Sequence, residues 1–462
     1  MMRVSGVLAI VVAGTALVVV DMTIVAIGLA DVARDLRVPT GDVDWVIVSY
    51  LLAMGAVTQV VGSLADRLGR RRTQLIGLTV FGAASLACGL APGLEALVAA
   101  RIVQGIGAAA IMTGALPLLS QHHTGEARNM AIATWGSASS AAALVAPLLG
   151  GVLVDGFGWR AVFLVNVPIC IVALLASARV LPADPAPDGK DRAPIDRTGT
   201  VLLIGALALL GHASLRGGQQ DGSDTLWQVA AGAALMVAFL LVERRAVAPV
   251  LALDLFRRAA FTGSALSLFL SRVLTVGGTV YLVLYVQESL GLGPTASGLL
   301  LLPVFLAQIG VGQLSGKLMS RFPPGHLIAA GFLAKAVGAG WLALIAAPTT
   351  SPWLLVAPLL IWGAGGGMTG APVFAVAMDA TAGERAGMVA GTISTLASIG
   401  AGIGTAALGL VHHAWAGPQP DAGSIAAGTA AVLVSSGVLA LVATTAVLLL
   451  IGGRTLTRSA PA

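Results

Sequence analysis

Asp21 is an acid in the middle of a long apolar run, residues 6–30. About 20 largely apolar residues cross a bilayer as a helix, so this carboxyl group is expected at membrane depth. A charge there costs at least about 2.5–3.5 kcal/mol, which makes an intramembrane acid a functional candidate by default. A carboxyl group that alternates between an apolar and a cationic setting can bind and release a proton. We therefore expect Asp21 to carry protons; a purely structural hydrogen bond between helices is the alternative.

Arg101 is the expected partner of Asp21. At a rise of about 1.5 Å per residue, Asp21 lies about 14 Å below the outer end of its helix and Arg101 about 8 Å below the outer end of its own. These depths allow a direct or water-bridged ion pair. The alternative is an arginine that only donates hydrogen bonds to backbone carbonyl groups.

Two further cations, Arg272 and Lys335, fall within apolar runs. Arg272 is too deep for easy snorkelling, whereas the Lys335 stem could reach either a cavity or the interface. One acid against three cations favours a neutral, zwitterionic or anionic substrate, with Arg272 as its counter-charge. Tyr281 and Trp362 lie at similar depth and could line an adaptable substrate cavity, with ordinary packing as the alternative.

The composition defines the elements that must position these residues. Of 462 residues, 57% are hydrophobic and 10% are charged, against about 25% charged in soluble domains. This excludes a set of soluble domains and predicts an all-α, multi-pass membrane protein. Fourteen spans are predicted, with edges uncertain by about four residues: 6–30, 43–63, 74–93, 96–119, 131–154, 161–181, 197–215, 225–243, 261–286, 295–318, 327–347, 352–377, 389–412 and 430–452.

Two loops at matching positions share glycine and leucine positions and a basic end: GSLADRLGRR from Gly62 and GQLSGKLMSR from Gly312. They predict two six-helix bundles, 1–181 and 259–462, joined by a linker with two additional spans, 182–258. Most Lys and Arg residues fall in segments that are cytoplasmic if the N-terminus is inside. The positive-inside rule therefore places both termini in the cytoplasm and the protein in the plasma membrane.

Four segments together resemble signatures of the major facilitator superfamily. They are Asp21-Met-Thr-Ile-Val, the loop Gly62–Arg72, Arg101-Ile-Val-Gln-Gly-Ile-Gly and Ala146-Pro-Leu-Leu-Gly-Gly. With fourteen spans, the chain is most similar to the fourteen-spanner drug/proton antiporter family. This resemblance implies the major-facilitator fold, proton coupling through Arg101 and antiport of drugs.

The resemblance also implies a conformational latch in the loop between the second and third spans. Its residues are Gly62, Asp66, Arg67, Gly69, Arg70 and Arg71. The glycines permit a tight turn, and the acid faces arginines with which ion pairs can break and reform. A simple positive-inside anchor is the alternative.

Pro147, Gly150 and Gly151 form the segment that the resemblance marks as an antiporter motif. Proline removes a backbone donor and kinks its helix, while glycines allow close packing. The family's usual glycine before the proline is Ala146 here, and alanine is nearly as small. An ordinary packing kink is the alternative.

No phosphate-binding GxxxxGK[ST] motif occurs, so a proton gradient rather than ATP is expected to drive transport, with no cofactor. Cys88 and Cys170 lie in apolar runs and suit neither a disulfide framework nor a metal site. A lone Asp21 cannot form the acid cluster of a membrane enzyme. We expect a functional monomer that exports small hydrophobic compounds by alternating access and binds no nucleic acid. A proton-coupled symporter importing a small metabolite is the alternative.

Overall fold

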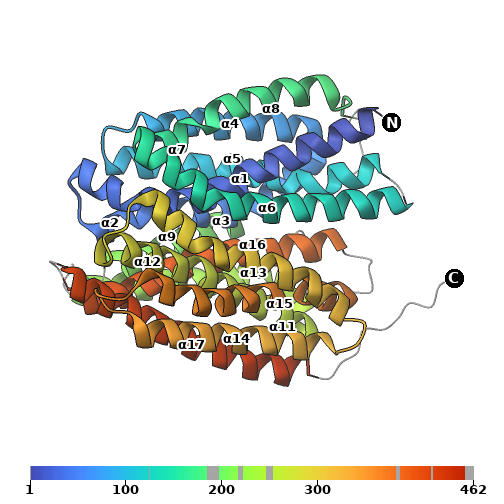
Figure 1. Cartoon of the computed structure of the whole chain (residues 1–462). Helices are drawn as coiled ribbons and strands as arrows, with labels where there is room; N and C mark the ends of the chain where they lie inside the picture. Colours follow the sequence, from blue (N-terminus) through green and yellow to red (C-terminus); the bar gives the residue numbers. More distant parts are fainter. Residues whose placement is uncertain are drawn as a thin grey trace. The chain divides into compact units, whose positions relative to one another are not determined.

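The structure, a computed structural model, describes residues 2–123, 125–184, 197–216, 222–245, 253–380, 386–417 and 420–452. Every regular element in these ranges is a helix, as the composition predicts (Figure 1). Contacts between the helices divide the chain into two compact units. Unit 1 comprises Met1–Arg216, Gln220–Val250 and Gly293–Leu299, and unit 2 comprises Gly217–Gln219, Leu251–Leu292 and Leu300–Ala462.

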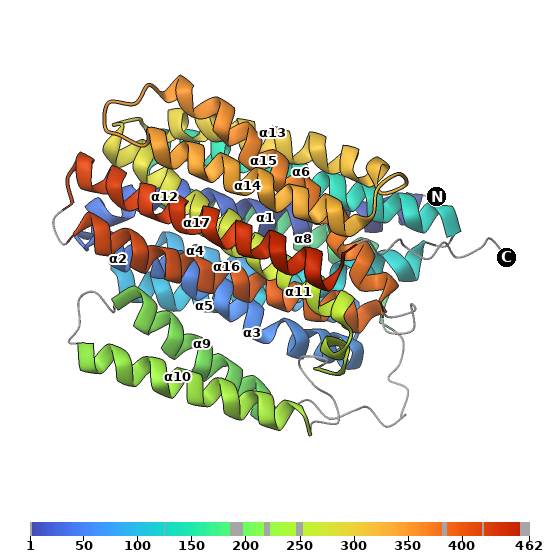
Figure 2. The ribbon, with the colours of Figure 1, turned by 90° about the horizontal axis from the view of Figure 1, so that it is seen from below.

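Unit 1 contains ten helices among its described residues. They are α1 (Met2–Leu36), α2 (Thr40–Val43), α3 (Trp45–Leu68), α4 (Arg70–Gly89), α5 (Leu94–His122), α6 (Gly125–Phe157), α7 (Arg160–Leu164), α8 (Asn166–Val180), α9 (Arg197–Arg216) and α10 (Gly222–Glu243). Helices α9 and α10 lie side by side, and α9 also packs on α3 (Figure 2). The division of the sequence into 1–181, 182–258 and 259–462 stays a prediction.

Unit 2 contains the remaining described elements. They are η1 (Leu253–Arg257), α11 (Ala259–Arg272), η2 (Val273–Gly277), α12 (Gly278–Leu284), η3 (Tyr285–Ser289), most of α13 (Pro294–Leu318), α14 (Pro324–Ile345), η4 (Pro352–Leu355), α15 (Val356–Asp379), α16 (Ala386–Ala416) and α17 (Ala422–Leu450). Both η2 and η3 are π-helical, whereas η1 and η4 are 3-10 helices. The α11–α12 segment therefore changes helical type twice.

Small residues bring the helices of unit 1 into backbone contact. A Cβ atom on Gly107 of α5 would lie 2.6 Å from the backbone nitrogen of Phe81 on α4, and one on Gly105 would lie 2.5 Å from the carbonyl oxygen of Tyr50 on α3. Real Cβ atoms do not approach this closely, so only glycine fits at either position. Close approach through small residues is how membrane helices associate. It fixes α5 between α3 and α4, and α5 also contacts α1.

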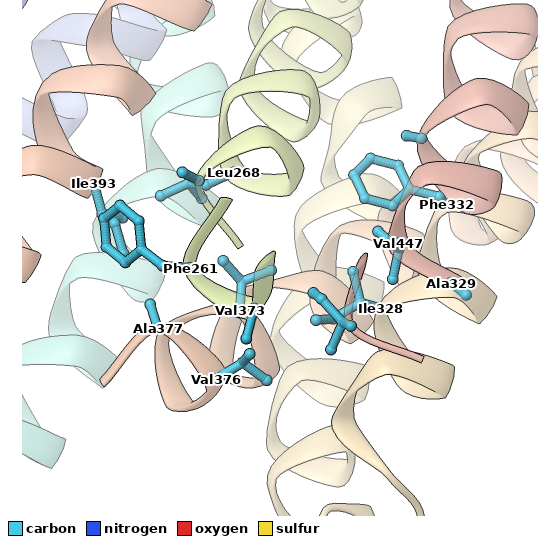
Figure 3. Close-up of a cluster of buried hydrophobic side chains, with 14 of the residues drawn as sticks. Phe261, Leu268, Ile328, Ala329, Phe332, Val373, Val376, Ala377, Ile393 and Val447 are labelled. Atoms are coloured by element: carbon cyan, nitrogen blue, oxygen red, sulfur yellow. The ribbon is translucent and has the colours of Figure 1, made fainter. Parts of the chain in front are cut away.

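Unit 2 has an apolar core where α11, α14, α15, α16 and α17 meet. Phe261, Leu268, Phe332, Val373 and Ile393 are buried there, and Figure 3 shows their side chains converging from these helices. These side chains and their apolar neighbours hold these five helices of unit 2 together.

Twelve helices in the described part of the chain are long and apolar enough to cross a membrane. The predicted count of fourteen is therefore not supported. The two predicted spans that do not qualify are 74–93 and 197–215. The first corresponds to α4, which begins with three arginines and also contains Gln74, and in the second the described apolar stretch is only Thr198–Leu210.

Candidate functional site

Asp21 on α1 lies in the interior of unit 1, with 0% of its surface exposed. Its Oδ2 atom accepts a hydrogen bond from Arg101 Nη1 at 2.6 Å. Its Oδ1 atom accepts one from Gln104 Nε2 at 2.9 Å and one from Asn166 Nδ2 at 2.8 Å. The structure thus brings Asp21 and Arg101 into a direct ion pair. That the pair couples protons to transport stays a prediction.

Arg101 on α5 is as deeply buried as its partner, with 1% of its surface exposed. Its Nε atom donates to the carbonyl oxygen of Val46 at 2.8 Å, and Nη1 also donates to Gln104 Oε1 at 2.6 Å. The guanidinium carbon lies 4.0 Å from the centre of the Tyr50 ring and 5.7 Å from that of Phe163. Aromatic faces attract a cation, and this attraction grows when both are desolvated. The arginine therefore makes both the predicted ion pair and the backbone bond of the alternative.

Gln104 extends the ion pair into a network that reaches α4. Its Nε2 atom also donates to Ser85 Oγ at 2.8 Å, and Ser85 in turn donates to the carbonyl oxygen of Phe81 at 2.8 Å. Cys88 Sγ lies 3.7 Å from Gln104 Oε1 as a weak donor. Fully satisfied buried networks of this kind are rigid, whereas partly satisfied ones are costly. Six helices, α1, α3, α4, α5, α7 and α8, contribute residues to this site.

Asn166 and Ser85 also belong to this network, although no role was predicted for either of them. Asp21 was identified because it is a charged residue inside an apolar run. Asn166 and Ser85 are uncharged, so the same criterion does not select them. The sequence does contain one indication for Asn166, which is an amide at the start of the apolar helix α8. An amide without a hydrogen-bond partner is costly in hydrocarbon, so such a residue is expected to have a partner.

The predicted latch loop is a turn between α3 and α4, and it is tied to the end of α8. Asp184 accepts hydrogen bonds from the backbone N–H groups of Arg71 and Arg72, both at 2.9 Å, and Arg71 Nη2 donates to the carbonyl oxygen of Ala178 at 2.7 Å. Gly69 has φ +99°, and a Cβ atom there would collide with the Asp184 carboxyl group. Asp184 is a further acid at this loop, and no role was predicted for it.

The other latch residues are placed less closely. Gly62 lies within α3, where the nearest atom to an added Cβ would be 3.9 Å away, and Arg70 begins α4. The side chains of Asp66 and Arg67 lie outside the described residues. The role of this loop as a latch stays a prediction.

Replacing Gly69 with alanine is expected to destabilise the protein by about 1–3 kcal/mol, because a side chain at a positive φ is strained and this one also meets Asp184. Thermal unfolding of the purified protein measures the effect. Gly93→Ala is the matched control, since Gly93 has φ −166° and open space around an added Cβ atom. Equal melting temperatures for the two variants would contradict the prediction.

The predicted antiporter motif lies in α6, where Gly150 faces α1 and Gly151 faces the first turn of α13. Pro147 is inside the helix, and Gly150 and Gly151 are both buried. A Cβ atom on Gly150 would lie 2.8 Å from Ile24 Cγ1 and 3.2 Å from the carbonyl oxygen of Ile24. Ile24 is about one helical turn from Asp21. The glycine thus lets α6 approach α1 next to the buried acid, and the motif's role in antiport stays a prediction.

The two aromatic candidates in unit 2 are buried by contacts within that unit. Tyr281 donates from its hydroxyl to the carbonyl oxygen of Thr405 at 3.1 Å, and its ring stacks on His412 with centres 5.0 Å apart. The Trp362 ring fills the space above Gly278, where an added Cβ would lie 2.6 Å from Cη2. Both rings therefore make packing contacts, and a role in a substrate cavity stays a prediction. The two cations differ: Lys335 is buried, and Arg272 is exposed.

No group of three or more His, Cys, Asp or Glu side chains among the described residues could hold a metal ion. Cys88 and Cys170 are both free thiols and both buried.

Comparison with known proteins gives a family match across most of the chain. The family model for the Major Facilitator Superfamily matches residues 11–405. The multidrug resistance protein Stp of Mycobacterium tuberculosis is 34% identical over 87% of this chain and 74% of its own length. The tetracenomycin C resistance and export protein of Streptomyces glaucescens is 32% identical over 86% of this chain and 74% of its own. The methylenomycin A resistance protein of Bacillus subtilis is 31% identical over 87% of this chain and 86% of its own length.

A solved structure has the same fold. It is a bacterial homolog of the human lysosomal transporter Spinster in an inward-facing and unoccupied conformation. It is 17% identical, has a TM-score of 0.66, and covers 100% of this chain and 99% of its own. At this level of identity the likeness concerns the fold alone.

Proposed function

The chain belongs to the major facilitator superfamily, and we propose that it is a proton-coupled exporter of small hydrophobic compounds such as antibiotics. Its relatives include proteins named for multidrug resistance and for resistance to tetracenomycin C and methylenomycin A. The observation that carries the proton-coupled part is the buried Asp21–Arg101 ion pair with its amide partners. Its energy source is the proton gradient, and no cofactor is required.

Ionised Asp21 fits the observed site because all three neighbouring groups donate to it. Protonation removes the negative charge and turns one carboxyl oxygen into a hydroxyl donor. Arg101 then loses its counter-charge, and the donors from Gln104 and Asn166 compete for fewer lone pairs. An uncompensated buried charge is strongly unfavourable. Proton binding therefore disfavours this arrangement of α1, α5 and α8.

A ligand shifts a conformational equilibrium only through a difference in its interaction with the two states. The proton satisfies this condition at Asp21, because the observed arrangement suits the carboxylate and an opened one suits the acid. In the proposed cycle Asp21 is loaded from the outer face and unloaded to the cytoplasm. Substrate enters from the cytoplasm or the inner leaflet and leaves when the carrier has been switched by the proton.

Transport by inside-out membrane vesicles tests the function. With an acidic lumen, we expect a panel of neutral, cationic and anionic antibiotics to contain compounds that accumulate severalfold in the lumen, each with release of luminal protons. A protonophore is expected to abolish this accumulation, and vesicles lacking the protein are the control. Movement of substrate and protons in the same direction would identify a symporter and overturn the proposal, as would accumulation that a protonophore leaves intact.

A further inference from the structure

Lys335 on α14 is a buried cation whose partners are all neutral. With 2% of its surface exposed, its Nζ atom donates to Thr275 Oγ1 at 2.6 Å, to Ser271 Oγ at 3.0 Å and to the carbonyl oxygen of Ser271 at 3.3 Å. Ser271 Oγ lies 3.3 Å from Thr369 Oγ1 on α15. The ammonium group therefore lies between helices of unit 2 and does not snorkel to the membrane interface.

The surrounding backbone is shaped to admit this side chain. A Cβ atom on Gly365 of α15 would lie 2.7 Å from Lys335 Cγ, so the glycine leaves room for the lysine stem. Thr275 belongs to the π-helical turn η2, and single π-helical turns inside α-helices are frequent at functional sites. Ser271 and Thr275 flank the beginning of this turn. A glycine, a π-helical turn and three hydroxyl groups thus build the pocket.

Arg272 provides a second positive charge immediately beside this pocket. It follows Ser271 at the end of α11, its side chain is exposed, and it lies close enough to repel the Lys335 ammonium group. An arginine side chain remains charged at any physiological pH. Successive helical residues point about 100° apart, so Arg272 reaches the surface of unit 2 while the Lys335 contacts stay inside.

No acid among the described residues of unit 2 pairs with either cation. The acids nearest along the two helices are Glu288, about 20 Å of helix beyond Thr275, and Asp379, about 15 Å beyond Thr369. Buried charges in proteins are normally paired, and charged side chains at membrane depth are costly and mark functional pathways. Two adjacent cations without an acid form a site with an unmatched positive charge.

We propose that Arg272 and Lys335, with the hydroxyl group of Thr275, form a binding site for the carboxylate of an otherwise hydrophobic small molecule. Arg272 makes the direct contact, since its exposed guanidinium group presents paired N–H donors that match a carboxylate. Lys335 acts through Thr275: its ammonium group donates to the Thr275 hydroxyl oxygen, so the O–H hydrogen of that group is free to point to a ligand. The Ser271 hydroxyl also accepts from Lys335, but its hydrogen is directed to Thr369 Oγ1, because Thr369 donates its own to the carbonyl oxygen of Gly366. The inference rests on the proposed export function and names a substrate class for it, hydrophobic carboxylic acids.

Binding of 2-naphthoate and its uncharged amide, 2-naphthamide, to the purified full-length protein tests the site. The two probes share shape and ring system and differ in charge. We expect naphthoate to bind more tightly, and Arg272→Gln to weaken naphthoate binding by about tenfold to a hundredfold, as expected for losing a hydrogen bond to a charged group. Binding of the amide is expected to change little. Lys335→Met is expected to weaken naphthoate binding as well.

Arg321→Gln is the matched control, because Arg321 is an exposed arginine of unit 2 that follows α13, away from the pocket. It is expected to bind both probes as the unaltered protein does. Equal affinity for acid and amide, or naphthoate binding unchanged by Arg272→Gln, would overturn the proposal. Loss of binding in Arg272→Gln but not in Lys335→Met would overturn the part assigned to the lysine. Thermal unfolding of each variant verifies that it is folded.

This result is separable from the proposed function. Proton-driven transport of any compound by the unaltered protein tests export, whether or not naphthoate binds. If export is found and the Arg272 test fails, only the carboxylate site is wrong. If naphthoate binds as expected but no compound is driven by a proton gradient, the site exists and the export proposal is wrong.

Discussion

Asp21→Asn is expected to reduce proton-driven efflux to background. Asparagine has almost the same shape, and its amide oxygen can still accept from Arg101, but it cannot bind or release a proton. The NH₂ group of the new asparagine takes the place of Asp21 Oδ1, which accepts from both Gln104 and Asn166 in the structure. A donor then faces two donors, and these hydrogen bonds are lost. Drug accumulation in inside-out vesicles, with and without a proton gradient, measures the effect. Gradient-driven accumulation undiminished by the substitution would refute the proton assignment.

Asp31→Asn is the control for this prediction, since it makes the same change on the same helix. Asp31 pairs with Arg34 at 2.7 Å, and the arginine side chain is 64% exposed. Surface ion pairs contribute about 0–1 kcal/mol, so efflux is expected to stay near that of the unaltered protein. Equal loss of efflux in both variants would show that replacing either acid of α1 impairs transport. That result would contradict a specific role for Asp21.

Arg101→Met is expected to destabilise unit 1 by about 3–5 kcal/mol, the cost of removing one partner from a buried ion pair. The substitution removes the cation that pairs with the buried Asp21 carboxyl group and the donor to the Val46 carbonyl oxygen. The reaction of a thiol-specific dye during heating measures unfolding, because Cys88 and Cys170 are free and buried in the folded protein. Arg34→Met, which removes an exposed arginine, is the matched control.

The double variant Asp21→Asn/Arg101→Met separates pairing from packing. When both charges are removed, no buried charge remains unpaired, so the double variant is expected to be more stable than Arg101→Met alone. It is still expected to lack proton-driven efflux. A double variant that loses the sum of the two single effects would show that the residues do not interact, contrary to the 2.6 Å contact.

The membrane class and the ion pair could be predicted from the sequence because both depend on quantities that it contains. Charge content decides between soluble and membrane proteins. Depth along a helix follows from residue number, so Asp21 and Arg101 could be matched across 80 residues of chain before any contact was known. The same reasoning placed Arg272 and Lys335 inside the membrane, but it could not say which of them is exposed and which is buried.

Other features depend on the direction in which a side chain points around its helix. Tyr281 and Trp362 were predicted from their depth as cavity residues, and in the structure their rings contact Thr405, His412 and Gly278 within unit 2. Neutral amides such as Asn166 carry no charge by which depth reasoning could select them.

The contact between Asp184 and the N-terminus of α4 joins residues 113 positions apart, beyond the last predicted span of the first half. Such a pairing depends on tertiary packing and leaves no local sequence pattern. The count of spans failed for another reason. Helix α4 begins with three arginines, so the apolar part that follows them is too short to cross a membrane by itself. When the arginines are included, the helix is no longer apolar enough.

The buried pair of Asp21 and Arg101 also has an electrical consequence. With the acid ionised, the pair is a dipole with no net charge, so the transmembrane voltage exerts little force on it. Once Asp21 is protonated, the same pocket carries one positive charge, and moving it through 100 mV is worth about 2.3 kcal/mol. In the proposed cycle, an interior-negative cell therefore pulls only the loaded form inward, and voltage as well as acidity would contribute to the energy for export.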